Sequence, residues 1–123
     1  MDCSGYVRMV YGYRSKMALC RAPRDDHAAI PRRAHEMASH APGVRVPRDE
    51  AVPGDLMFFN TDADDGPRID HVGIYLGCDT KGHRRFLSSR KRADGPTMGD
   101  TGGKSILDGD GLYANAFCEA RRL

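Results

Sequence analysis

Apolar side chains near the start of the chain recur three or four residues apart, at Tyr6, Val7, Val10 and Tyr11. This spacing places them on one face of a helix, which would bury that face against the rest of the domain. The pattern therefore predicts a first helix from Cys3 to about Tyr11, closed by Gly12.

A second helical pattern follows a long polar stretch. Residues 13–29 show no sustained period, so we predict a loop there. Proline suits the first position of a helix, and we expect the second helix to begin near Pro31 and to run through Ala38. Its inward face is predicted to consist of Ala34, Met37 and Ala38.

Short apolar runs in the second half of the chain predict strands. These are expected at Leu56–Phe59, Val72–Leu76, Arg85–Ser89, 106–107 and 113–121. Clusters of glycine, proline and aspartate predict surface loops at residues 62–67 and 93–103. Helices first and strands afterwards predict an α+β fold, in which a helix packs on an antiparallel sheet.

Length and charge narrow the class of protein. The chain has 123 residues, which suits one domain with a real core, so we expect a single domain over residues 1–123. Its 19 basic and 17 acidic residues leave a formal net charge of +2, too close to neutral to indicate a nucleic-acid partner. No apolar run approaches the length of a membrane span, and no signal peptide precedes Cys3.

The four cysteines are Cys3, Cys20, Cys78 and Cys118, and they form no C-x-x-C pair. We therefore expect no zinc site. A disulfide among Cys20, Cys78 and Cys118 stays open. The simplest interpretation of each cysteine is a small buried apolar side chain.

Cys3 has a second interpretation, because it stands at the start of the first predicted helix. Unpaired backbone N–H groups and the helix dipole favour an anion there, which would lower the pKa of the thiol and favour the nucleophilic thiolate. A histidine, His71, leads the predicted strand Val72–Leu76. A cysteine and a histidine far apart in sequence are a common basis for thiol catalysis, so Cys3 is expected to be the reactive thiol.

Three segments together resemble the NlpC-type family of bacterial cell-wall cysteine peptidases: Asp2-Cys3-Ser4-Gly5, Pro53-Gly54-Asp55-Leu56 and Asp70-His71-Val72-Gly73-Ile74-Tyr75. They occur in the family's order, and the matching region covers nearly the whole chain. The resemblance implies a papain-like fold, in which a nucleophile on the N-terminal helix faces a histidine on the antiparallel sheet. In this chain Cys3 would be the nucleophile and His71 the general base.

The resemblance also implies the reaction, which is hydrolysis of an amide in a peptidoglycan stem peptide, usually between γ-D-glutamate and a diamino acid. Attack by Cys3 would give a thioester, which water resolves with His71 as base. No metal or organic cofactor is implied, and the location would be secreted or in the cell envelope. The family usually carries a further segment before its Asp-Cys-Ser-Gly motif, and we expect this domain to lack it, since only Met1 precedes Asp2.

The resemblance assigns further residues around this pair. Asp2 and Ser4 would bind the amine end of the substrate, although either could instead cap the first helix. The family places a polar residue on the next strand to orient the imidazole, and Ser88 stands at that position. We expect Ser88 to be the third catalytic residue, with Ser89 and His83 as alternatives.

Two aspartates in the motifs are expected to have structural roles. Asp55 can hold neighbouring N–H groups at the turn before its strand. Asp70 would point to the opposite side of the strand from His71, because successive side chains alternate, so it should not touch the imidazole.

Two rival functions remain open. One keeps the fold but loses the reaction, leaving a wall-binding or regulatory module. The other keeps catalysis but changes the substrate, as in acyl transfer or hydrolysis of another amide, and a large apolar channel would be its mark.

Overall fold

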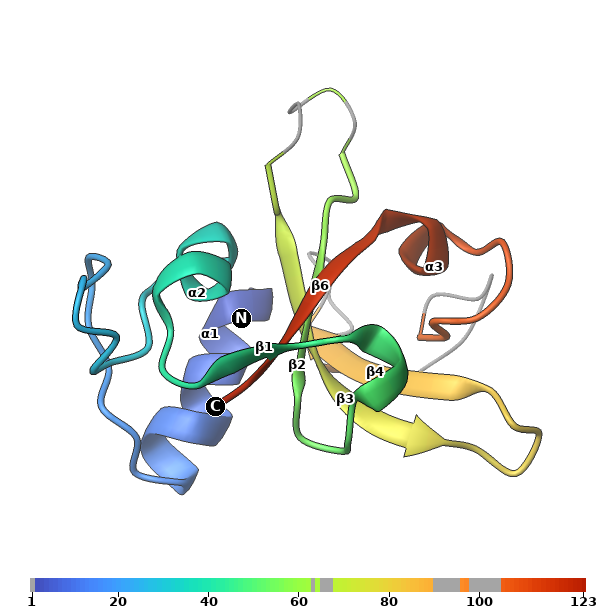
Figure 1. Cartoon of the computed structure of the whole chain (residues 1–123), viewed down its shortest axis with the longest axis horizontal. Coiled ribbons are helices and arrows are strands. Elements are labelled where there is room, and N and C mark those ends of the chain that lie inside the picture. The colour runs from blue at the N-terminus through green and yellow to red at the C-terminus, as the bar shows by residue number, and fades with distance from the viewer. Residues whose placement is uncertain (1, 63, 65–67, 90–95, 98–104) are drawn as a thin grey trace.

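An antiparallel sheet forms the centre of the molecule (Figure 1). A computed structural model of the chain describes residues 2–62, 64, 68–89, 96–97 and 105–123. Within these residues the sheet has six strands in the order β1-β6-β2-β3-β4-β5, and neighbouring strands are antiparallel. The strands are β1 (Val44–Val46), β2 (Leu56–Phe59), β3 (His71–Cys78), β4 (Arg84–Ser89), β5 (Pro96–Thr97) and β6 (Phe117–Arg122).

Helices cover both faces of this sheet. α1 (Cys3–Arg8) continues directly into a π-helical segment, η1 (Met9–Arg14), and lies with α2 (Ala34–His40) on one side of the sheet (Figure 1). α3 (Leu112–Ala116) lies on the other side and leads directly into β6. A 3-10 turn, η2 (Arg48–Glu50), follows β1.

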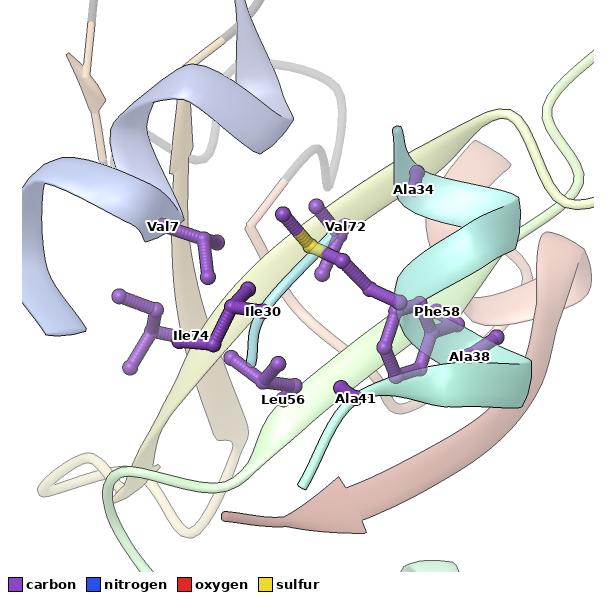
Figure 2. Close-up of a cluster of buried hydrophobic side chains, with 10 residues drawn as sticks. Val7, Ile30, Ala34, Ala38, Ala41, Leu56, Phe58, Val72 and Ile74 are labelled. Carbon is purple, nitrogen blue, oxygen red and sulfur yellow. The ribbon is translucent and has the colours of Figure 1, made fainter. Parts of the chain in front are cut away.

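The core between the sheet and the first two helices is apolar throughout (Figure 2). Alternate residues of a strand point to opposite faces, so Leu56 and Phe58 of β2 reach the same face as Val72 and Ile74 of β3. Buried side chains from α1, α2 and the chain between and after them meet this face: Val7, Ile30, Ala34, Met37, Ala38 and Ala41. This packing holds the start of α1 against β3.

The opposite face of the sheet carries a second, more aromatic core. Met57 and Phe59 of β2 lie there with Tyr75 of β3 and Phe86 of β4. Leu107, Tyr113 and Ala120 complete the buried cluster. Tyr113 comes from α3, so the short last helix closes this face as α1 and α2 close the other.

A buried arginine joins α2 to the sheet. Arg121 of β6 donates from Nη1 to the carbonyl oxygen of Ala41 and from Nη2 to that of Ala38, each at 3.0 Å. The last carbonyls of a helix have no partner inside the helix, so the guanidinium caps α2 from the far strand. Burial lowers the pKa of Arg121.

The predicted α+β architecture, with an N-terminal helix on an antiparallel sheet, is confirmed. Of the predicted strands, 56–59 is confirmed and 72–76 and 85–89 lie within longer ones, and the buried face of α2 is confirmed as well. Gly12 does not close the first helix, which continues as η1, and α2 begins at Ala34 rather than near Pro31.

The predicted strand at residues 113–121 is wrong in its first part, because Leu112–Ala116 is helical and the strand begins at Phe117. Residues 106–107 form only an isolated bridge, between Arg85 and Ile106. The predicted loops at 62–67 and 93–103 lie mostly outside the described residues. Among the segments that the structure does describe, no helix has the length and apolar character needed to cross a membrane.

Candidate active site

Cys3 is the first residue of α1 and is partly buried against the apolar core. Asp2 caps the helix: its Oδ1 accepts a hydrogen bond from the backbone N–H of Gly5 at 2.7 Å. Aspartate is among the favoured N-cap residues, because its side chain satisfies an N–H that the helix itself cannot. The helical capping role that the sequence offered for Asp2 is therefore the one that the structure forms.

Burial raises the pKa of the Cys3 thiol, and the negative charge of Asp2 acts in the same direction. Backbone N–H groups of Val72, Ser4 and Cys3 itself act to lower it, without reversing the shift. The expectation that the helix start lowers this pKa is therefore wrong for the free protein. Desolvation of the charged form outweighs the N–H groups of a short helix.

Arg32, in the segment before α2, holds the two residues on either side of Cys3. Its Nη2 donates to Asp2 Oδ2 at 2.9 Å, and its Nη1 donates to Ser4 Oγ at 2.7 Å. The side chains of Arg32 and Asp2 remain 44% and 53% exposed, so this pair faces solvent, whereas Ser4 is buried. Burial acts to raise the pKa of Asp2, but Arg32 and the Gly5 N–H outweigh it and lower that pKa.

His71 is the first residue of β3 and is 8% exposed. Its imidazole packs against two aromatic rings that also contact each other, with ring centroids 5.0 Å from Tyr113 and 5.9 Å from Phe59. The carboxylate of Asp70 instead accepts hydrogen bonds from the backbone N–H groups of Thr61 and Asp62, each at 2.8 Å. Asp70 thus fixes the loop after β2, as expected of a residue on the other side of the strand.

Cys3 and His71 meet through Val72. Cys3 packs against the apolar core that includes Val72, the residue after His71, and the backbone N–H of Val72 acts to lower the pKa of the Cys3 thiol. The start of α1 is therefore docked on the end of β3 where His71 begins the strand. The imidazole itself lies among the aromatic rings of the second core, and the thiol belongs to the first core.

Ser88 of β4 lies on the same face of the sheet as His71. A Cβ on Gly73, two residues after His71, would lie 3.3 Å from the Cβ of Ser88. Ser88 is 1% exposed, and its Oγ is buried with no hydrogen-bond partner among the described residues. The expected hydrogen bond from Ser88 to the imidazole is therefore not formed in this conformation.

The two alternatives to Ser88 are placed differently relative to His71. Ser89 follows Ser88 along β4 and so points to the other face of the sheet. His83 lies in the turn between β3 and β4, where its backbone N–H donates to Asp79 Oδ1 at 3.0 Å. That turn is at the opposite end of β3 from His71.

The structure also shows the surroundings of Asp55 and of the four cysteines. Asp55 is 2% exposed and accepts hydrogen bonds from the Val52 N–H at 2.9 Å and from Arg122 Nε at 3.0 Å, which confirms a structural role. All four cysteines are free thiols, and Cys78 and Cys118 are exposed rather than buried. Within the described residues, no group of three or more histidine, cysteine or acidic side chains is placed to hold a metal.

Two residues at the site were missed in the sequence. Arg32 stands in an irregular segment and reaches Asp2 and Ser4 across about thirty residues of chain, a contact that no local pattern encodes. The sequence predicts a strand at Tyr113 and therefore does not predict that Tyr113 approaches His71 from a helix. For Arg32, the nearest signal in the sequence is its position directly after Pro31 and just before a helix.

The chain is similar in sequence to known proteins. The model of the NlpC/P60 family matches residues 1–104. A protein named "Probable endopeptidase p60" from Listeria monocytogenes is 37% identical over 76 residues, which are 62% of this chain and 12% of that protein. "Murein DD-endopeptidase MepH" from Escherichia coli is 36% identical over 76 residues, 62% of this chain and 23% of that protein.

"Probable endopeptidase NlpC" from Escherichia coli is 37% identical over 75 residues, 61% of this chain and 39% of that protein. The matched segment therefore spans well under half of each of these relatives. The family-model match over residues 1–104 includes Cys3, His71 and Ser88 of this chain.

Proposed function

Because the chain belongs to the NlpC/P60 family, we propose that it is a cysteine endopeptidase that cleaves an amide bond in peptidoglycan stem peptides. The observation that carries the proposal is the packing of Cys3, at the start of α1, against the core that includes Val72, the residue after His71, in a chain whose residues 1–104 match the family model. The names of the relatives, endopeptidases and a murein endopeptidase, support the same substrate class.

In the proposed mechanism His71 removes the proton of the Cys3 thiol, and the sulfur attacks the amide carbonyl to form a tetrahedral intermediate. The C–N bond then breaks as His71 protonates the departing amine, which leaves a thioester on Cys3. Water, deprotonated by His71, attacks the thioester and releases the carboxylic acid, and the thiol takes the proton back. The proposed bond joins γ-D-glutamate to a diamino acid.

The raised pKa of Cys3 fits a mechanism that needs a base. A thiol whose pKa is raised rests protonated at neutral pH, so its proton must be removed as the reaction begins. The backbone N–H groups of Cys3 and Ser4 approach the sulfur. Such donors can also stabilise the oxyanion of the tetrahedral intermediate.

Asp2 and Ser4 are proposed to form the subsite for the amine end of the substrate. The Asp2 carboxylate is half exposed and keeps its negative charge, because its pKa is lowered. Arg32 already donates to both residues, so an incoming ammonium group would share Asp2 with the guanidinium. In this proposal Arg32 positions the subsite.

Ser88 is proposed as the third residue, which orients the imidazole. Its buried hydroxyl has no hydrogen-bond partner among the described residues, a state that normally costs free energy and calls for an explanation. A hydroxyl on the same face as His71 can supply the missing bond once the imidazole moves during catalysis.

The proposed location, secreted or in the cell envelope, follows from the substrate.

The same observation favours a second candidate, a wall-binding module with weakened catalysis, because the Ser88–His71 hydrogen bond is not formed. The test uses purified protein with a synthetic stem peptide and measures fragment release by mass spectrometry, with Cys3→Ala as the control. We expect release by the natural chain and binding without release by Cys3→Ala. If both proteins bind the peptide and neither releases a fragment, the domain functions as a wall-binding module and not as a peptidase.

A further inference from the structure

The imidazole of His71 is flanked by a ring from the last helix. The ring centroids of Tyr113 and His71 lie 5.0 Å apart with an interplanar angle of 39°. Phe59 lies on the imidazole as well, at 5.9 Å and 49°. Tyr113 stands beyond residue 104, where the match to the family model ends. This contact therefore belongs to a part of the chain that the family model does not cover.

The Tyr113 side chain has little freedom to leave this position. It is 8% exposed and meets Phe59 and Phe86 edge to face, with centroids 5.2 and 5.4 Å away. The helix that carries it is fastened at its end, because the Asn60 N–H donates to the carbonyl oxygen of Ala116 at 2.9 Å. Asn60 follows Phe59 directly, so the same end of β2 supplies both the anchor of α3 and the second ring on the imidazole.

We propose that Tyr113 is a positioning residue for His71, which sets the orientation of the imidazole by ring packing. This inference rests on the proposed function, in which His71 is the general base. A histidine base needs one ring orientation, so that the same nitrogen meets the thiol in each turnover. Packing against two aromatic rings restricts rotation of the imidazole, and edge or tilted contacts at this distance are favourable for aromatic pairs.

The arrangement also explains how the ring is held while Ser88 Oγ makes no hydrogen bond. In this conformation the aromatic rings of Tyr113 and Phe59 both contact the imidazole. The hydroxyl of Ser88 is then needed only when the ring carries a proton. In this proposal Tyr113 acts through His71.

The test compares Tyr113→Leu and Tyr113→Met, which remove the ring, with Tyr113→Phe, which keeps it. Phe117→Leu is the matched control: Phe117 also packs edge to face on Phe59, at 6.0 Å, but among the described residues its ring does not pack on His71. We expect the two ring-removing variants to lower kcat about tenfold with KM unchanged. Tyr113→Phe and Phe117→Leu should stay near the natural value.

A second readout does not depend on peptide cleavage. The ring C–H signals of His71 in NMR spectra, assigned by their loss in His71→Gln, should shift and broaden in Tyr113→Leu and Tyr113→Met, because the neighbouring ring current is lost and the imidazole samples more orientations. They should stay sharp in Tyr113→Phe and Phe117→Leu. If the natural chain cleaves no stem peptide, the proposed function fails while this measurement still decides whether Tyr113 holds the ring.

Three results would overturn the inference. Equal loss of kcat in Phe117→Leu and in the ring-removing variants would mean that the aromatic cluster acts only through stability. Loss in Tyr113→Phe equal to that in Tyr113→Leu would assign the effect to the hydroxyl rather than to the ring. An unchanged His71 signal and an unchanged kcat in Tyr113→Met, the variant that best preserves buried volume, would show that the ring needs no help from α3.

Discussion

The guanidinium of Arg32 donates to the carboxylate of Asp2 at 2.9 Å, which ties the start of the helix that carries Cys3 to the segment before α2. The same guanidinium reaches Ser4, so the residues on both sides of Cys3 are fixed by one side chain. A nucleophile at the first position of a short helix would otherwise fray with the helix end. Arg32 thus links the second helical region to the placement of the thiol.

Arg32→Met tests this link, since methionine keeps an unbranched apolar stem but removes every donor. We expect kcat/KM for a stem peptide to fall about tenfold, because Asp2 and Ser4 lose their common partner. Stability should change little, since exposed ion pairs contribute at most about 1 kcal/mol. Steady-state kinetics and thermal unfolding measure the two effects.

Arg24→Met is the control for that variant. Arg24 forms a comparable ion pair with Asp26 on an exposed loop, at 2.7 Å. The Arg24→Met variant should keep both kcat/KM and the unfolding temperature near the values of the natural chain. A loss of activity in Arg24→Met as large as that in Arg32→Met would show that removing any arginine in this half of the chain has the same effect.

Asp2→Asn should make Cys3 more reactive towards alkylation at neutral pH. The negative charge of Asp2 helps to raise the pKa of the Cys3 thiol, after the larger effect of burial. Asparagine keeps the helix cap but removes the charge, so the pKa of Cys3 should fall and more thiolate should be present at a given pH. The rate of iodoacetamide labelling at Cys3, followed by peptide mapping across pH, measures the shift.

Asp110→Asn serves as the charge-matched control, because Asp110 is exposed next to α3 on the other side of the sheet. Its labelling curve at Cys3 should coincide with that of the natural chain. If the Asp2→Asn curve moved to higher pH, the carboxylate would be lowering rather than raising the pKa of Cys3.

The sequence predicted those parts of the fold in which local period and burial agree. Two examples are the strand Leu56–Phe59 and the inward face of α2, formed by Ala34, Met37 and Ala38. In both, the apolar residues of the pattern are buried in the core. The strand predicted at residues 113–121 is wrong in its first part, because a five-residue helix followed directly by a strand is too short to show a helical period. There the tertiary contact of Tyr113 with the aromatic core outweighs local preference.

The residues of the candidate site also fall into those that the sequence predicts and those that it does not. Cys3 and His71 were found because motifs mark them, whereas Arg32 and Tyr113 act through contacts between distant segments. The pKa of Cys3 was predicted with the wrong sign, because burial and the charge of Asp2 depend on the folded surroundings. A sequence motif identifies a reactive residue more readily than it predicts the electrostatics around it.

Gly43→Ala should be among the most destabilising single methyl additions in the described structure. Gly43 has a φ of +88°, and a Cβ there would overlap the carbonyl oxygen of Arg122 in β6. Backbone of a paired strand cannot give way cheaply, so we expect a loss of about 3 kcal/mol or more. Urea denaturation followed by circular dichroism measures the change.

Gly109→Ala separates backbone strain from the clash. Gly109 has a similar φ of +85°, but a Cβ there would meet nothing within 4 Å. This variant should lose only about 1 kcal/mol, the usual cost of a left-handed conformation. Equal losses at the two positions would mean that the close approach between Gly43 and Arg122 is relieved without cost.

Ser88→Ala should separate activity from stability. The Ser88 hydroxyl is buried without a hydrogen-bond partner among the described residues, so its removal should leave stability unchanged or slightly higher. If the hydroxyl bonds to His71 during catalysis, as proposed, kcat should fall about tenfold. Ser88→His would not test this well, because the site is 1% exposed and lies close to Gly73, so a larger ring would strain the core.

Ser89→Ala is the matched control, because Ser89 is equally buried but points to the other face of the sheet. Its kcat should stay near the natural value whatever happens to its stability. Kinetics and urea denaturation of both variants in parallel give the comparison. A Ser88→Ala variant with unchanged kcat would remove Ser88 from the site, and a loss confined to Ser89→Ala would mean that the imidazole is served from the opposite face.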